Sequence, residues 1–206
     1  MANLTSDISN ALTDRLSIIE ALLPQLEKDV LDLQGTSNAK KTKTNIFDLV
    51  TEADLHSEKI ITSAIQKHFP KDAILAEEGT NSGAQDSESF TWVIDPIDGT
   101  VNYANSLHHW GISVGIIYQN TPVAGIVSAP SLNKRYRAIK GHGAAKNGDP
   151  IQVSIKSLLS GGVIVTGFPY DRAIRAEHLS KALANFLKVA GGVRRFGAAS
   201  IDFCSV

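Results

Sequence analysis

The sequence has almost no cysteine, no long apolar run and no excess of either charge. A single cysteine among 206 residues excludes a disulfide within the chain and fits a reducing compartment. No apolar stretch approaches membrane-spanning length, and the opening MANLTSDISNALTDR lacks the charged and apolar regions of a signal peptide. With 20 basic and 21 acidic side chains, no positive field favours a nucleic acid polymer. These absences predict a cytoplasmic protein that binds neither membranes nor nucleic acid.

The composition is that of an ordinary globular protein, with 43% hydrophobic and 20% charged residues. The chain is long enough for one large domain, or for one complete domain and part of another. Apolar residues spaced by three and four predict an amphipathic helix over 12–33, with a kink or a division into two segments at Pro24. A second helix is predicted from Thr51 to a point before Pro70. The polar segment 34–45 between them is predicted to be a mobile loop.

After Pro70 the pattern changes to short apolar runs separated by turn residues, which predicts strands. Turn residues at 119–121 and 147–148 predict hairpins and antiparallel pairing, so we expect an α+β domain over 1–150. The remainder, 151–206, reads as strand, helix, strand and the start of a helix, as at the beginning of a parallel α/β domain. We expect this second domain to be incomplete in this chain, because two strands are too few to stand alone. The predicted strands cover 73–76, 91–94, 111–117, 123–129, 135–139, 162–166 and 192–196, and the later helices cover 173–189 and the residues from 198.

Acidic residues directly follow two of these predicted strands. Glu77 and Glu78 come after the first, and Asp95 and Asp98 come after the second. Side chains at the tips of neighbouring strands converge, and several carboxylates at one point repel one another unless a cation lies among them. Oxygen ligands without a companion cysteine or histidine favour Mg²⁺ or Mn²⁺ over Zn²⁺. The sequence therefore predicts a site for a hard divalent ion.

The residues around these aspartates favour an anion site beside the metal. Pro96 fixes its own φ and holds Asp95 extended, while the carbonyl of Ile97 is left free to ligate. Gly99 permits close approach of a ligand, and a helix beginning at Thr100 would offer free N–H groups to an anion. A cation beside an anion site indicates phosphate. The alternative is a plain surface turn and a solvated Glu-Glu pair, but the two motifs together, each after a strand, favour the site.

The spacing of the acids argues against other metal and phosphate motifs. The two aspartates lie three residues apart, whereas phosphoaspartyl phosphatases place theirs two apart. The apolar Ile97 breaks the EF-hand pattern. No Gly-x-x-x-x-Gly-Lys loop is present to hold nucleotide phosphates.

The stretch 95–102, Asp-Pro-Ile-Asp-Gly-Thr-Val-Asn, resembles the signature of the inositol monophosphatase family, the lithium-sensitive, magnesium-dependent phosphatases. This resemblance implies a layered αβαβα sandwich, a phosphoric monoester hydrolase and a homodimer, as is usual in the family. It continues in order along nearly the whole chain. Further matching segments are Asp-Leu-Val-Thr-x-Ala-Asp at 48–54, Ala-Glu-Glu at 76–78, Gly-x-Gly-Ala at 141–144, Asn-Gly at 147–148, Gly-Phe-Pro at 167–169 and Arg-x-Gly-Ala-Ala at 195–199.

Carried over residue by residue, the resemblance implies two or three metal ions. Glu77, Asp95 and the carbonyl of Ile97 would hold the first ion. Asp95 and Asp98 would hold the second, and Glu77 would also touch a more weakly bound third. Glu77 and the hydroxyl of Thr100 would align a metal-activated water for attack on phosphorus.

The resemblance also implies the contacts to the substrate and to the catalytic threonine. Gly99 and Thr100 would bind phosphate through their backbone N–H groups. Asp54 would orient the Thr100 hydroxyl, and Lys43 would lie in the mobile loop over the site. The residues near the substrate hydroxyls would be Gly197, Ala198 and Ala199.

Several functions stay open within this resemblance. The substrate could be an inositol phosphate, histidinol phosphate, fructose bisphosphate or a 3′-phosphonucleotide, because the phosphate end of the site is shared. The family's second signature, Trp-Asp followed by small residues, supplies a further aspartate to the second metal and lies beyond Val206. A chain without that ligand could be a non-catalytic metal-binding regulatory or interaction protein, or a shortened form of a longer enzyme.

Overall fold

The computed structural model describes residues 4–35, 41–42, 49–83 and 89–206. Most of the predicted loop at 34–45, including Lys43, lies outside the described residues, so the expectation for Lys43 stays a prediction. The elements are α1 (Ser6–Leu33), β1 (Lys41–Thr42), β2 (Leu49–Val50), α2 (Glu52–His68), β3 (Ala73–Ala76), β4 (Phe90–Asp98), α3 (Thr100–Ala104), β5 (Gly111–Tyr118), β6 (Thr121–Ala129), η1 (Pro130–Leu132), β7 (Lys134–Ile139), β8 (Gly143–Lys146), β9 (Asp149–Ile151), η2 (Leu159–Gly161), β10 (Val163–Val165), α4 (Ala176–Leu187), β11 (Gly192–Arg194) and α5 (Ala199–Cys204).

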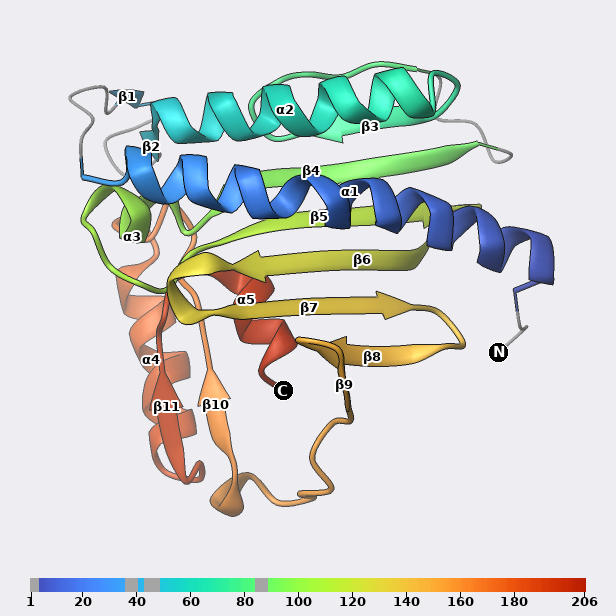
Figure 1. Ribbon diagram of the computed structural model, residues 1–206. Coiled ribbons are helices and arrows are strands. Elements are labelled where there is room, and N and C mark those ends of the chain that lie inside the picture. Colours follow the sequence, from blue (N-terminus) through green and yellow to red (C-terminus); the bar gives the residue numbers. More distant parts are fainter. Residues whose placement is uncertain (1–3, 36–40, 43–48, 84–88) are drawn as a thin grey trace.

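A seven-stranded sheet forms the middle of the molecule (Figure 1), in the order β3-β4-β5-β6-β7-β8-β9. Strands β3 and β4 pair in parallel, and the other neighbours pair antiparallel. Positive φ angles at Gln119, Asn120, Asn147 and Gly148 form the tight turns of two hairpins. The predicted hairpins are therefore confirmed, and the sheet is mostly antiparallel.

Helices α1 and α2 lie side by side on one face of this sheet, and α5 lies against the opposite face at β5 and β6 (Figure 1). The apolar stripe of α1 packs on the inward side chains of the central strands. Helix α1 continues through Pro24 as one element, so of the two predicted alternatives the division into two segments is wrong and the kink stays a prediction. The fully buried residues of the stripe are Leu12, Leu16, Ile19, Leu23, Leu26 and Val30.

A buried ion pair fixes α1 to the start of β3. The guanidinium of Arg15 makes two hydrogen bonds of 2.8 Å to the carboxylate of Asp72, which also accepts the indole N–H of Trp92 at 2.8 Å. The guanidinium lies over the rings of Phe69 and Phe90, at 4.4 and 3.9 Å from their centroids. Every charge in this cluster is thus paired within an apolar setting.

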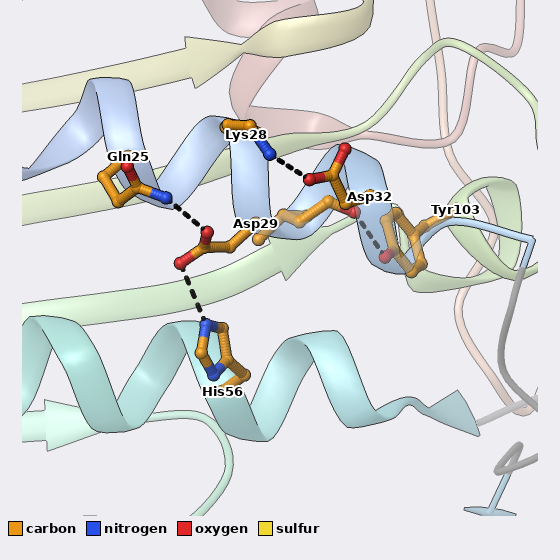
Figure 2. A network of polar contacts seen from close by, with 7 residues as sticks. Gln25, Lys28, Asp29, Asp32, His56 and Tyr103 are labelled. Carbon is orange, nitrogen blue, oxygen red and sulfur yellow. Dashed lines mark hydrogen bonds and ion pairs between the residues drawn. The ribbon is translucent and has the colours of Figure 1, made fainter.

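Polar contacts also join α1 to α2 and α3 (Figure 2). Asp29 accepts a hydrogen bond of 2.7 Å from Gln25, and Nε2 of His56 in α2 lies 3.3 Å from its carboxylate. The hydrogen bonds from Gln25 and His56 lower the pKa of Asp29. The hydroxyl of Tyr103 in α3 donates to the carbonyl of Val30 at 2.7 Å. Helix α3 is therefore anchored to the end of α1.

The last part of the chain has the predicted order of strand, helix, strand and helix. Strands β10 and β11 pair in parallel, and α4 packs against β11. The seven-stranded sheet ends at Ile151 in β9, and the division into domains near residue 150 stays a prediction. No helix in the described part of the chain has both the length and the apolar character of a membrane span. The layered α+β class predicted for the chain is confirmed.

Candidate functional site

The parallel pairing of β3 with β4 brings two acidic residues together. Ala76 pairs with Ile94, and the N–H of Glu77 donates to the carbonyl of Ile94 at 3.1 Å. The residue that follows Ile94 is Asp95, whose side chain makes a hydrogen bond with that of Glu77. The convergence of these two carboxyl groups follows directly from the strand register.

A bulge in β4 explains how Asp98 can lie near Asp95. The sequence predicts that both aspartates follow the strand, but β4 continues to Asp98. Asp95 pairs with Ser113 and Asp98 with Gly111, so β4 carries one extra residue between these pairs. In a regular strand, residues three apart point to opposite faces of the sheet. With one inserted residue between them, two such residues can point to the same face. Proline is tolerated here because a bulge leaves a ladder hydrogen bond unmade.

Asp95 has an environment that favours a bound cation. Burial, the negative charges of Glu77 and Asp98, the hydrogen bond with Glu77 and the charge of Asp54 together raise the pKa of Asp95 from 3.8 to about 9. Its Oδ1 atom is buried and has no hydrogen-bond partner. A divalent ion would satisfy this oxygen and offset the repulsion. The donors are all oxygen atoms, so the residues present fit a hard ion such as Mg²⁺.

The carboxylates are nevertheless not arranged as a finished metal site. Among the described residues, no three His, Cys, Asp or Glu side chains are placed to share one ion. Glu77 and Asp95 are in contact, but Oδ2 of Asp98 accepts the N–H of Ser200 at 2.6 Å. Asp98 is thus close enough to raise the pKa of Asp95 while it is tied to α5. The predicted ligands are neighbours, and their roles as ligands stay a prediction.

The hydroxyl of Thr100 lies between two predicted site residues. It is 3.2 Å from Oδ1 of Asp54 and 3.0 Å from the carbonyl oxygen of Ile97. The other carboxylate oxygen of Asp54 accepts the N–H of Thr51 at 2.9 Å, at the start of α2. The Asp54–Thr100 pairing is therefore present as geometry. The carbonyl of Ile97 was expected to be free, but it is shared with the threonine hydroxyl.

Gly99 joins this site to residues near the end of the chain. Its φ angle of 88° is in the left-handed region that favours glycine. A Cβ atom there would lie 3.1 Å from the Cβ of Ala198, 3.1 Å from the carbonyl oxygen of His109 and 3.2 Å from that of Gly197. The loop therefore has room only for glycine, and residues predicted to contact phosphate and substrate lie side by side.

A cavity of about 1080 Å³ opens beside this loop. Asp98 lines this cavity, whereas Glu77 and Asp95 do not. Asp95 is close enough to both Asp98 and Glu77 for their charges to interact, so the acidic pair lies just behind the cavity wall. Three cationic side chains, Lys156, Arg172 and Arg195, also line it and favour an anionic ligand. The predicted substrate residues in the wall are Gly99, Thr100, Gly197, Ala198 and Ala199.

Some contacts at this edge were not predicted from the sequence. Nε2 of His109 lies 3.0 Å from Oδ1 of Asp202, and its ring stacks on Phe196 with centroids 4.6 Å apart. The side-chain amide of Asn102 donates to the carbonyl oxygens of His109 and Phe196, at 2.6 and 2.7 Å. His109 and Asp202 are 93 residues apart in the sequence, and Asn102 and Phe196 are 94 residues apart. No local pattern could have revealed them.

Comparisons with known proteins identify a family and several relatives of this chain. The sequence profile of the Inositol monophosphatase family matches residues 15–206. An inositol-1-monophosphatase of Synechocystis sp. is 38% identical over 178 residues, which cover 86% of this chain and 62% of the relative. A protein of Pseudomonas aeruginosa named Nus factor SuhB is 36% identical over 163 residues, which cover 77% of this chain and 60% of the relative. The chain thus spans less than two thirds of the length of either relative.

A solved structure gives the same answer for the fold. The inositol monophosphatase from Anabaena (Nostoc) sp. matches with a TM-score of 0.82 and 33% sequence identity, over 95% of this chain and 71% of that one. The predicted resemblance is confirmed by both sequence and structure. The chain belongs to the inositol monophosphatase family.

Proposed function

We propose that this protein is a Mg²⁺-dependent phosphatase that hydrolyses a small alcohol phosphate, with an inositol monophosphate as the first candidate. The observation that carries the proposal is the buried, unpartnered oxygen of Asp95 beside Glu77, next to a glycine loop and a Thr100–Asp54 pair. The name of the Synechocystis relative supports the choice of substrate. Histidinol phosphate, fructose bisphosphate and 3′-phosphonucleotides are the alternative substrates.

In this proposal, Glu77, Asp95, Asp98 and the carbonyl of Ile97 hold two or three divalent ions, with Mn²⁺ as a possible substitute. Such ions, when bound, stabilise charge on the phosphoryl group and lower the pKa of water. Asp95 must lose its proton to bind them, because a metal and a proton compete for the same oxygen atoms. Binding should therefore strengthen as pH rises toward the raised pKa of Asp95.

The remaining residues orient the water and the phosphate. The Thr100 hydroxyl donates toward Asp54 at 3.2 Å or the Ile97 carbonyl at 3.0 Å, and its lone pairs stay available to accept a hydrogen bond from the attacking water. The backbone N–H groups of Gly99 and Thr100 bind the phosphate oxygens. As the water oxygen bonds to phosphorus, the water gives a proton to the carboxylate of Glu77 and the bond to the ester oxygen breaks. The leaving alkoxide takes up a proton from solvent and departs as the alcohol.

The cavity supports an anionic substrate larger than phosphate alone. Its volume of about 1080 Å³ and the positive side chains of Lys156, Arg172 and Arg195 suit a phosphorylated polyol. Gly197, Ala198 and Ala199 would then face the alcohol portion. A cytoplasmic location and a homodimer belong to this proposal as predictions.

A second candidate is a binding role without catalysis. It is favoured by the 36% identity to the Pseudomonas relative, whose name is Nus factor SuhB. In this case the acidic pair would bind a metal ion but no ester would be hydrolysed. The macromolecular partner would then have to be sought separately.

Phosphate release from a panel of small esters tests the two candidates. Release that needs Mg²⁺, stops with EDTA and disappears in the Asp95→Asn variant supports the phosphatase. An exposed aspartate on β9, Asp149, supplies the matched control Asp149→Asn. Mg²⁺ binding by calorimetry without release from any ester would favour the binding role and would overturn the proposed hydrolysis.

A further inference from the structure

Helix α2 presents three buried polar side chains to the candidate site. Asp54, Ser57 and Glu58 are spaced so that they share one face of the helix, and their exposed fractions are 1, 0 and 3%. Asp54 reaches the hydroxyl of Thr100 at 3.2 Å, and the hydroxyl of Ser57 donates to the carbonyl of Pro96 at 3.2 Å. Two of the three therefore hold the segment that carries Asp95 and Thr100. The third, Glu58, holds the other acidic segment.

Glu58 accepts two backbone hydrogen bonds from the turn that follows β3. The N–H of Glu78 donates to its Oε2 at 2.7 Å, and the N–H of Thr80 donates to its Oε1 at 3.0 Å. Hydrogen bonds to a charged acceptor are stronger than those between neutral groups, and burial strengthens them further. A buried carboxylate whose two oxygens each have a donor is thus a firm anchor for this turn.

Glu77 is held from both sides as a result. Its own N–H donates to Ile94 of β4 at 3.1 Å, and the N–H of the next residue, Glu78, donates to Glu58. Between these two anchors, the side chain of Glu77 makes its hydrogen bond with Asp95. Because both anchors act on backbone atoms next to Glu77, they fix the direction in which its carboxylate leaves the chain.

We propose that Glu58 is a positioning residue that sets the carboxylate of Glu77 against Asp95 and thereby determines the affinity for divalent ions. This inference rests on the proposed function for the identity of the ion. Both carboxylate oxygens of Glu58 accept N–H groups of the turn, so Glu58 acts through the turn and does not itself ligate the ion. Residues that orient metal ligands in this way typically change metal affinity or activity by about 10- to 100-fold when they are replaced.

The two hydrogen bonds suggest a variant that removes one acceptor of Glu58 while keeping the shape of the side chain. Glutamine has nearly the same shape as glutamate but only one acceptor oxygen, and its NH₂ group would face an N–H donor. Glu58→Gln therefore leaves one of the two turn amides without its acceptor. Glu52, on the exposed side of the same helix, gives the control Glu52→Gln, which removes the same charge. Glu58→Asp keeps the charge and both acceptors on a shorter side chain.

Two measurements are made on the 206-residue chain and these variants. Amide hydrogen exchange of the metal-free protein, followed by NMR, reports on Glu78 and Thr80. Calorimetric titration with Mg²⁺ reports the dissociation constant. Glu58→Gln should speed exchange at one or both amides and weaken Mg²⁺ binding by about 10- to 100-fold, whereas Glu52→Gln should change neither. The exchange rates and the Mg²⁺ dissociation constant of Glu58→Asp should lie between those of Glu58→Gln and those of the unmodified protein. If Glu58→Gln does not fold, Glu58→Asp takes its place in both measurements.

The outcomes separate this inference from the proposed function. Unchanged exchange and a Mg²⁺ dissociation constant within twofold of the unmodified protein would overturn the role of Glu58. Faster exchange with unchanged Mg²⁺ affinity would reduce it to structural support and would also overturn the inference. If the unmodified protein binds Mg²⁺ and releases no phosphate from any ester, hydrolysis fails while the two measurements on Glu58 keep their meaning.

Discussion

Replacing Asp95 by asparagine should make the metal-free protein more stable while it removes metal binding. In the folded chain, burial and the charges of Glu77 and Asp98 raise the pKa of Asp95 from 3.8 to about 9. The folded state therefore holds a proton that the unfolded state releases across this range. Stability contributed by this group is fully present below pH 4 and is lost progressively as pH rises toward 9. Asparagine is close in shape and does not ionise, so it avoids this loss.

The size of the effect follows from one proton per molecule. A difference of one bound proton changes the free energy of unfolding by about 1.4 kcal/mol for each pH unit. Between pH 4 and pH 7 the advantage of Asp95→Asn over the unmodified chain should therefore grow to at most about 4 kcal/mol. Saturating Mg²⁺ should reverse the order, because only the unmodified protein gains stability from binding.

Urea unfolding at several pH values, with EDTA and then with Mg²⁺, measures both effects. The exposed Asp149→Asn variant should follow the unmodified protein under every condition. Phosphate release by Asp95→Asn should fall to the background seen with EDTA. An Asp95→Asn protein that is less stable than the unmodified chain in EDTA at pH 8 would refute the argument, because the carboxyl group would then be stabilising in its ionised form.

Three further outcomes are expected. Arg15→Met leaves the buried carboxylate of Asp72 without its guanidinium partner and should cost about 3 to 5 kcal/mol in urea unfolding, and a cost below about 1 kcal/mol would contradict the buried pairing. Gly99→Ala should lower the free energy of unfolding by about 1 to 3 kcal/mol and abolish phosphate release. The new methyl group would meet two carbonyl oxygens and another methyl group within 3.2 Å. Normal phosphate release by this variant would show that the loop can open. A double-mutant cycle of Asp202→Asn with His109→Ala should give a coupling of about 0.5 to 3 kcal/mol in unfolding, and strict additivity would mean that the 3.0 Å contact has no energetic role.

The sequence predicts the helices and most strands correctly because their periodicity records burial directly. The stripe of α1 illustrates this, since its apolar residues at spacings of three and four are buried. The predicted strand over 91–94 is shorter than β4, because the pattern of apolar residues places Asp95 and Asp98 after the end of the strand. Alternation cannot reveal a bulge, and a bulge is what carries β4 through Pro96.

The candidate site also contains residues that the sequence could indicate and residues that it could not. Asp54, Asp95 and Thr100 are near one another because three neighbouring elements, α2, β4 and α3, carry them, and the motifs that contain them could be recognised locally. Glu58 could also have been suspected, because it is a charged residue on the apolar face of a predicted helix. His109 and Asp202 could not, because spacing along the chain carries no information about contacts between segments so far apart.

The double hydrogen bond of the Asn102 amide has a consequence for the order in which the molecule takes shape. It ties together chain segments 94 residues apart, and the contact of Asp98 with Ser200 spans 102 residues. Closing loops of this length is slow compared with pairing neighbouring hairpins. During synthesis α1, α2 and the seven-stranded sheet can therefore assemble first, and the loop at Gly99 acquires its final neighbours only when residues near 200 have left the ribosome.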